Sequence, residues 1–265
     1  MDRKMAGRMS RISLGLALAV SLAVAAQGTA QTIAQRVDGM KLPPKFGISV
    51  AIYDQTQDYQ FDSLSLGLPG IDLSEIENVA VTNDTETAYL MADYWVLPFL
   101  NVFGLFGTVS GTTKVGLGAI DTGLPIRLGD LRIHYSGTVY GGGATLSGGG
   151  EHVFSSLTYE YTNTDLDVTD ASVKAWVVTA KLGTRVADAG AVWMGVMYQS
   201  VDEHHTGTYT LPYLGSFPFD AKFDAEQPYN FLLGGTVAIT EHWTLIMEGG
   251  IGGRTSALVQ LGYRF

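Results

Sequence analysis

The stretch with the clearest capacity for chemistry is V-D-E-H-H, residues 201–205, in which Asp202 stands two residues before His204. A carboxylate paired with an imidazole can serve as a general base. Adjacent histidines and acids can also bind a metal ion, but two ligands do not make a metal site. Asp202 and His204 are therefore weak catalytic candidates, and no metal site is predicted.

Other motifs give catalysis little support. The glycine-rich Y-G-G-G-A-T-L-S-G-G-G, residues 140–150, lacks the Gly-Lys-Ser/Thr ending of a phosphate-binding loop. We expect strand glycines there instead, with a β-bulge near 139–140 and Tyr140 covering bare backbone. No Gly-x-Ser-x-Gly nucleophile motif occurs in the chain. No cofactor is predicted, and a role as an enzyme is the less favoured alternative.

The N-terminus has the pattern of a secretory signal. Residues 1–11 carry four basic side chains, and residues 12–26 form an uncharged apolar run. A spanning helix needs about 20 apolar residues, so this run favours a signal peptide, cleaved after Ala26 or Ala30, over a membrane anchor. We therefore divide the chain into a signal peptide (1–30), a periplasmic segment (31–44) and one folded domain (45–265).

Charge and composition exclude several classes of protein. The formal net charge is −10, and it falls to −13 once residues 1–30 are removed, which argues against nucleic-acid binding through a basic patch. The chain has no cysteine, which excludes disulfides, thiolate metal sites and cysteine nucleophiles. Beyond residue 30 there is no apolar run long enough for a transmembrane helix.

The elements that must position any site are strands, because apolar residues recur at every second position. In the stretch 229–239, for example, the odd positions are apolar or small while several even positions are polar or small. Ten strands are predicted: 46–58, 85–97, 102–112, 132–147, 152–164, 171–186, 190–202, 228–240, 243–252 and 256–265. The expected fold class is all-β, a closed antiparallel transmembrane β-barrel of about ten strands, with eight or twelve as alternatives.

The connections and the aromatic residues favour a membrane barrel. The expected periplasmic turns (98–101, 148–152, 187–190 and 240–242) are short, whereas most outer connections (59–84, 113–131, 165–170, 203–227 and 253–255) are longer. Aromatic residues near strand ends suit two girdles at the membrane interfaces. The expected members are Phe99, Phe103, Trp243, Tyr263 and Phe265 on the periplasmic side, and Tyr53, Tyr161, Tyr198 and Tyr229 on the outer side.

The chain ends in L-V-Q-L-G-Y-R-F, in which Val259, Leu261, Tyr263 and Phe265 alternate with other residues. With its signal, alternating strands and terminal aromatic strand, the chain resembles the small outer-membrane β-barrels of Gram-negative bacteria. In such proteins the closing residues form an assembly signal for the barrel-insertion machinery. The stretch 92–107, A-D-Y-W-V-L-P-F-L-N-V-F-G-L-F-G, further resembles a group of exported barrel proteins without an assigned activity.

The resemblance bears on the catalytic candidates. Omptins are ten-stranded barrel proteases that carry an Asp–His half-site roughly where Asp202 and His204 stand. Their second acidic pair is missing, since the second outer loop offers only Asp121 and Asp130, which are far apart in sequence. The omptin pattern is therefore half absent.

Ionisable residues within strands are costly against lipid, so we expect them to face the lumen. This predicted lumen charge network comprises Asp93, Glu160, Lys181, Arg185, Glu248 and Arg264. A paired network that fills a narrow lumen is favoured over an ion pathway or a catalytic constellation. If these side chains form ion pairs with one another, they fill the lumen as a plug. If they remain separate and hydrated, they line a pore.

The resulting functional hypotheses concern a protein of the Gram-negative outer membrane. The first is a narrow, porin-like transport or permeability barrel, or a structural barrel. The second is a surface-binding barrel, adhesin-like or receptor-like, that acts through its acidic outer loops; the third is a protease or lipid-modifying enzyme. Expected partners are outer-membrane lipid, lipopolysaccharide and the barrel-assembly machinery, with divalent cations at the acidic loops and no nucleic acid.

Overall fold

The computed structural model describes residues 44–66, 80–116, 131–150, 152–167, 172–186, 190–211, 215–225 and 227–265, without the side chains of 60–66, 131, 172, 202–211 and 215–225. The predicted signal peptide (1–30) and all but the last residue of the predicted periplasmic segment (31–44) lie outside the described residues. No helix within the described ranges is long and apolar enough to cross a membrane.

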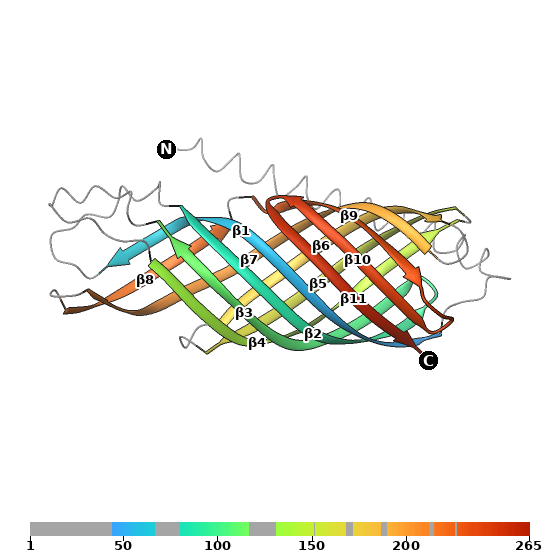
Figure 1. The fold of residues 1–265 in the computed structure, drawn as a ribbon, viewed down its shortest axis with the longest axis horizontal. Helices are drawn as coiled ribbons and strands as arrows, with labels where there is room; N and C mark the ends of the chain where they lie inside the picture. The colour runs from blue at the N-terminus through green and yellow to red at the C-terminus, as the bar shows by residue number, and fades with distance from the viewer. Residues whose placement is uncertain are drawn as a thin grey trace, which may run out of the picture. The chain divides into compact units, whose positions relative to one another are not determined.

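The described chain is a closed antiparallel β-barrel whose strands run obliquely around the barrel axis (Figure 1). Its strands are β1 (Phe46–Leu66), β2 (Val81–Leu97), β3 (Leu100–Val115), β4 (Leu131–Gly149), β5 (Val153–Leu166), β6 (Ser172–Val186), β7 (Gly190–Leu211), β8 (Gly215–Ala225), β9 (Tyr229–Ala238), β10 (Trp243–Gly252) and β11 (Arg254–Arg264). All ten predicted strands are present.

Ten of these strands form the ring, because β9 pairs with β7 and the last strand closes on the first. The closing seam joins β1 to β11 from Gly47↔Arg264 to Gln57↔Arg254 without a register shift. Every strand of the ring therefore has a neighbour on both sides, which confirms the prediction of a closed barrel of ten strands.

Strand β8 was not predicted, since 203–227 was expected to be a loop. The structure instead extends β7 to Leu211 and returns through β8. Strand β1 leaves β11 after Gln57 and pairs with β8 from Tyr59 onwards, so β8 continues the wall beyond the ring. The threonines and tyrosine of T-G-T-Y-T, residues 206–210, favour such an extended conformation.

The two ends of the barrel differ in their connections. At the terminal end β1 begins, β11 ends and the turns are short; at the opposite loop end β1 and β3 end and β2 and β4 begin (Figure 1). The turns at the terminal end span 98–99, 150–152, 187–189 and 239–242. The four connections predicted to be short are therefore short. At the loop end, 167–171 is longer than each of these turns, as predicted, whereas residue 253 alone joins β10 to β11.

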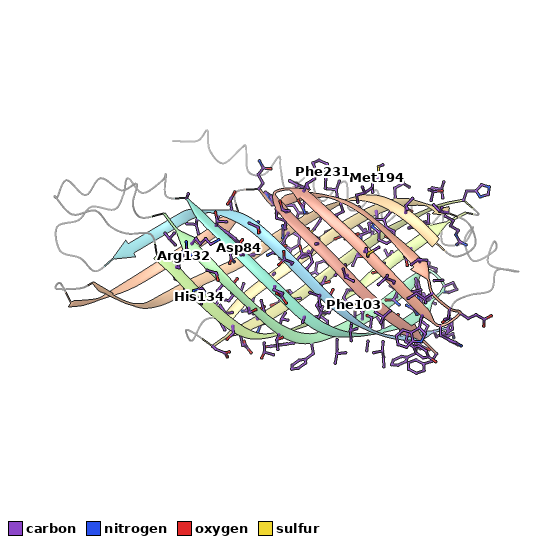
Figure 2. All side chains as sticks on the ribbon, viewed as in Figure 1. Asp84, Phe103, Arg132, His134, Met194 and Phe231 are labelled. Carbon is purple, nitrogen blue, oxygen red and sulfur yellow. The ribbon has the colours of Figure 1, made fainter. Side chains whose placement is uncertain are left out.

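Apolar side chains form a belt around the outside of the barrel. On β9, Leu233 is 69% exposed whereas its neighbour Leu232 is 4% exposed, because successive strand residues face opposite sides. Met194 on β7 and Phe231 on β9 likewise point away from the barrel (Figure 2). An outward apolar face with polar residues inside is typical of transmembrane barrels.

Aromatic residues cluster at both edges of this belt. At the terminal end Tyr263 contacts Phe265 and Trp243, with ring centroids 5.0 Å apart in each case. Towards the loop end Tyr198 contacts Trp176 and Tyr229 at 5.1 Å. The expected girdles are thus present at both edges.

Two of the expected girdle residues face the interior instead. Tyr53 and Phe103 line the lumen, because the odd-numbered residues of β1 and β3 point inward while even-numbered residues such as Ile52 and Val102 are exposed. Their assignment to the girdles was wrong, since position near a strand end does not determine which face a residue occupies.

The glycine-rich strand β4 is regular. It pairs with β3 from Val115↔Leu131 to Leu100↔Leu146 without a shift, so the expected bulge near 139–140 is absent. Tyr140 faces outward and its hydroxyl accepts a hydrogen bond from Asn163 at 2.7 Å. Bare backbone is covered instead at Gly143, where an added Cβ would come within 2.6 Å of Phe103 Cζ.

If the apolar belt faces lipid, a charged substitution within the belt should destabilise the barrel more than the same substitution outside it. Replacing Leu233, in the middle of the belt on β9, with arginine should lower the free energy of unfolding in lipid by about 2–4 kcal/mol. The matched control is Thr255→Arg, which places the same charge on an exposed outward position beyond the belt and should cost about 0–1 kcal/mol. Denaturant unfolding in lipid vesicles measures both. Equal costs would show that the belt does not face hydrocarbon.

Candidate functional site

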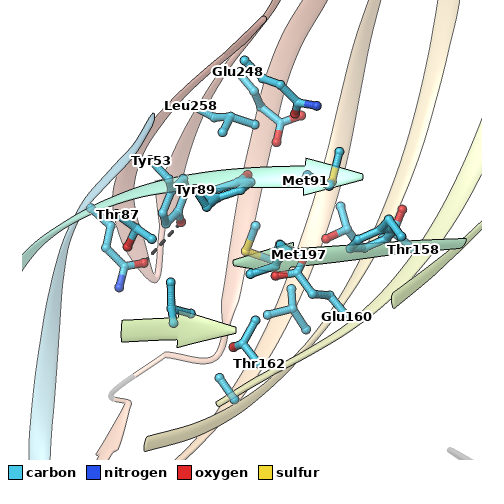
Figure 3. A pocket seen from close by; sticks show the side chains of 18 of the residues that line it. Tyr53, Thr87, Tyr89, Met91, Thr158, Glu160, Thr162, Met197, Glu248 and Leu258 are labelled. Carbon is cyan, nitrogen blue, oxygen red and sulfur yellow. Dashed lines mark hydrogen bonds between the residues drawn. The ribbon is translucent and has the colours of Figure 1, made fainter. Parts of the chain in front are cut away.

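The candidate site is a cavity of about 720 Å³ inside the barrel. Inward-facing residues of all ten ring strands line it, from Asp93 and Arg264 near the terminal end to Asn83 and Thr113 near the loop end. Hydroxyl, amide and carboxyl groups alternate there with aliphatic and aromatic side chains. Figure 3 shows part of the wall. The described part of the barrel thus encloses a cavity whose wall carries both polar and apolar side chains.

A first ion pair lies beside the closing seam. Arg264 of β11 contacts Asp93 Oδ2 of β2 through Nη2 at 2.7 Å, and Asn101 Nδ2 donates to the same oxygen at 2.6 Å. Arg264 Nη1 also donates to the Pro44 carbonyl at 3.1 Å. The pair crosses β1 at Gly47, where a Cβ would lie 3.1 Å from Asp93 Cγ. The absence of a side chain at Gly47 therefore makes room for the pair.

A second ion pair joins β6 and β10. Lys181 Nζ lies 2.5 Å from Glu248 Oε2, and the indole Nε1 of Trp193 donates to the same oxygen at 2.5 Å. Lys181 also lies over the Trp193 ring, 5.2 Å from its centroid. Gly234 leaves room for this indole, because a Cβ there would lie 2.7 Å from Nε1. Both charges are thus held by several partners.

The other two members of the predicted network are not in these pairs. Glu160 of β5 lines the cavity and has no hydrogen-bond or ion-pair partner among the described residues. Arg185 is exposed at the end of β6 near the terminal end and does not line the cavity. The structure therefore brings four of the six residues together, as Asp93 with Arg264 and Lys181 with Glu248.

A buried arginine near the loop end was missed by the sequence analysis. Arg254 is 2% exposed, and its Nη1 donates to Gln199 Oε1 and, at 3.4 Å, to Gln55 Oε1. Its Nε and Nη2 have no hydrogen-bond partner among the described residues. The sequence predicts a connection at 253–255, which includes Arg254. On β11, however, Arg254 and Arg264 are separated by an even number of residues and so face the same side of the strand. Extending the strand by two residues would have predicted an inward arginine.

The structure places the backbone of the catalytic candidates in strand β7. Asp202 pairs with Lys174 of β6, and His204 pairs with Lys222 of β8. Their side chains lie outside the described residues, as do most of the acidic residues of the outer loops. Within the described part, no cluster of three or more His, Asp or Glu residues could hold a metal ion.

Asp84 is one of the acidic residues near the loop end whose side chains are described. Asp84 of β2 is exposed and pairs with Lys114 Nζ at 2.6 Å, while Thr56 Oγ1 donates to it at 2.8 Å. The hydrogen bond from Lys114, followed by that from Thr56, lowers the pKa of Asp84 below its ordinary value. The Asp84–Lys114 ion pair is exposed to solvent and can therefore be compared with the two ion pairs inside the barrel.

Comparisons with known proteins give structural likenesses of low identity. No protein-family model and no curated protein matches the chain. The transport unit of the autotransporter AIDA-I from Escherichia coli is 11% identical, with a TM-score of 0.42, over 91% of this chain and 98% of that one. The translocator domain of the autotransporter NalP from Neisseria meningitidis is 14% identical, with a TM-score of 0.39, over 92% and 98%.

A third similar structure is an outer-membrane channel from Pseudomonas putida F1. It is 12% identical to this chain, with a TM-score of 0.39, over 86% of this chain and 98% of that one. At these identities and TM-scores the likenesses carry nothing about what this chain does. The site must therefore be interpreted from its own residues.

The lumen pairs should matter more to stability than the exposed pair. Asp93→Asn leaves the Arg264 guanidinium without its counter-ion, and we expect it to lower the free energy of unfolding by about 3 kcal/mol. Asp84→Asn makes the same chemical change in the exposed pair with Lys114, and should cost at most about 1 kcal/mol. Denaturant unfolding of both variants tests this. An Asp93→Asn variant as stable as Asp84→Asn would show that the lumen pair is fully hydrated.

Proposed function

We propose that the protein is an integral β-barrel of the Gram-negative outer membrane whose lumen passes small polar solutes. The observation that carries the proposal is the cavity of about 720 Å³ lined by all ten ring strands. It extends from the level of Asp93 and Arg264 to the level of Asn83 and Thr113. A lumen filled by a charge network would leave no such space.

The exterior supports a membrane location. Outward residues of β9 and its following turn, from Tyr229 to Ile239, are apolar or glycine. Their span matches the 9–11 residues of a tilted transmembrane strand. The aromatic clusters around Tyr198 and Tyr263 suit the two interfaces, where amphipathic rings are favoured. With the short turns on the periplasmic side, the terminal end faces the periplasm and the loop end faces outward.

The interior supports a narrow pathway. Barrels of eight strands are filled by side chains and those of sixteen leave an open aqueous channel, so ten strands leave an intermediate space. Near the terminal end, Arg264 contacts Asp93 and approaches the Trp95 ring to 6.0 Å. These side chains narrow the space, and the pathway therefore suits small molecules better than large ones.

The last strand supports the proposed assembly partner. Outward residues Val259, Leu261 and Tyr263 alternate along β11, which forms the closing seam with β1, and Phe265 directly follows the strand. The Phe265 ring packs against Phe46 with centroids 5.4 Å apart. A terminal strand of this type suits recognition by the barrel-assembly machinery. Lipid and lipopolysaccharide are the proposed partners of the belt and of the outer loops.

Conductance tests the transport function. The purified protein in planar bilayers should give small single-channel steps. Glu248→Gln removes one carboxylate and leaves Lys181 facing the cavity, so ion selectivity should shift towards anions. Glu86→Gln neutralises an exposed outward residue of β2 and should leave selectivity unchanged. A folded, membrane-inserted wild type that conducts no ions would contradict the transport function.

A further inference from the structure

We propose that the cavity binds a small organic ammonium ion, with Glu160 as its counter-ion and tyrosine rings and methionine sulfurs around its apolar part. The inference rests on the proposed function in that the ligand enters through the lumen. It adds a solute class and a binding residue to that function.

The charge balance of the cavity leaves Glu160 without a partner. Five acidic or basic residues line the cavity: Asp93, Glu160, Lys181, Glu248 and Arg264. Four of them form the two ion pairs described above. Arg254 does not line the cavity, since its guanidinium is buried against Gln199 and Gln55. Among the described residues that line the cavity, Glu160 is therefore the one charged side chain without an ion-pair partner.

The described residues around Glu160 do not form a site for a metal ion. Calcium takes six to eight oxygen ligands, usually including several carboxylates. No group of three acidic or histidine side chains occurs in the described residues, and both other cavity carboxylates are already paired. A single carboxylate is instead sufficient for an ammonium group, because one charge balances the other and the remaining contacts can be weakly polar.

The other neighbours favour an organic cation. Tyr53, Tyr89 and Met91 from β1 and β2, and Met197 from β7, border the same space as Glu160 (Figure 3). Aromatic faces attract cations, and methionine sulfur is soft and polarisable, so alkylated ammonium groups are bound well by such walls. Strongly hydrated inorganic cations gain less from them.

Choline and its uncharged isostere 3,3-dimethyl-1-butanol test the proposal by calorimetry on the folded protein in detergent. We expect saturable choline binding and at least about tenfold weaker binding of the isostere, because only choline carries a charge for Glu160 and the tyrosine rings. This comparison uses the wild type alone and does not depend on the folding of any variant. Equal binding of the two probes, or no choline binding, would overturn the proposal.

Variants then locate the site. Glu160→Gln should weaken choline binding at least about tenfold, whereas the exposed control Glu86→Gln should leave it unchanged. Tyr89→Leu should weaken binding and Tyr89→Phe should retain most of it, because phenylalanine keeps the aromatic face. Unchanged choline affinity in folded Glu160→Gln would exclude this residue and overturn the proposal.

The two functional claims fail in different ways. Choline binding by a barrel that conducts no ions would keep the site and remove the transport function. Ion conduction without choline binding would keep the transport function and remove the site. A preference for the uncharged isostere would assign the cavity to neutral solutes.

Discussion

The structure depends on the pairing of its first strand with its last. In hydrocarbon, an unpaired backbone N–H or C=O costs several kcal/mol, so a sheet can cross a membrane only without free edges. The unbroken register between β1 and β11 supplies this closure. It also fixes which residues face outward, because a slip of one residue would exchange the two faces of the strand. The apolar belt and the polar lumen both follow from this one alignment.

The lumen chemistry is tied to the same seam. The pair between Asp93 and Arg264 joins β2 to β11 across β1, at a glycine that makes room for it. Its contribution to stability therefore includes holding the two ends of the sheet together. The pair between Lys181 and Glu248 joins strands farther around the ring and orders the indole of Trp193. With these four charges satisfied, Glu160 remains available to a ligand.

Much of the fold could be predicted because the strands of a membrane barrel alternate between outward apolar residues and inward polar or small residues. Alternation of the kind seen along 229–239, together with the short turns, located all ten ring strands. Lipid excludes charged residues from the outward face of a strand. The inward placement of four charged residues could therefore be predicted from their odd or even position in the strand: Asp93, Glu160, Lys181 and Glu248. Strand β8 was missed because 203–227 contains acidic residues, glycines and two prolines, a composition typical of a loop. Extended hairpins outside the membrane need no apolar face, and so leave no such pattern.

The ion pairs of the site were less predictable than the strands. Which side chains meet across the lumen depends on the stagger of the strands around the barrel, which sequence spacing does not give. Asp93 and Arg264 are 171 residues apart, and only the closing seam brings them together. A fully paired network was the favoured interpretation, whereas the structure leaves Glu160 without a described partner and Arg185 exposed. Arg254 was missed through a strand boundary set two residues too late. Tyr53 and Phe103 were misplaced because strand-end position was given more weight than parity.

A cysteine scan of β11 tests the central claim, that this strand separates lipid from a hydrated lumen. The chain has no cysteine, so single substitutions from 256 to 262 can be labelled without background. In lipid vesicles, a membrane-impermeant maleimide should react at the inward positions Leu258, Gln260 and Gly262, and react poorly at the outward positions Ala257, Val259 and Leu261. Uniform reactivity, or the opposite alternation, would contradict the account.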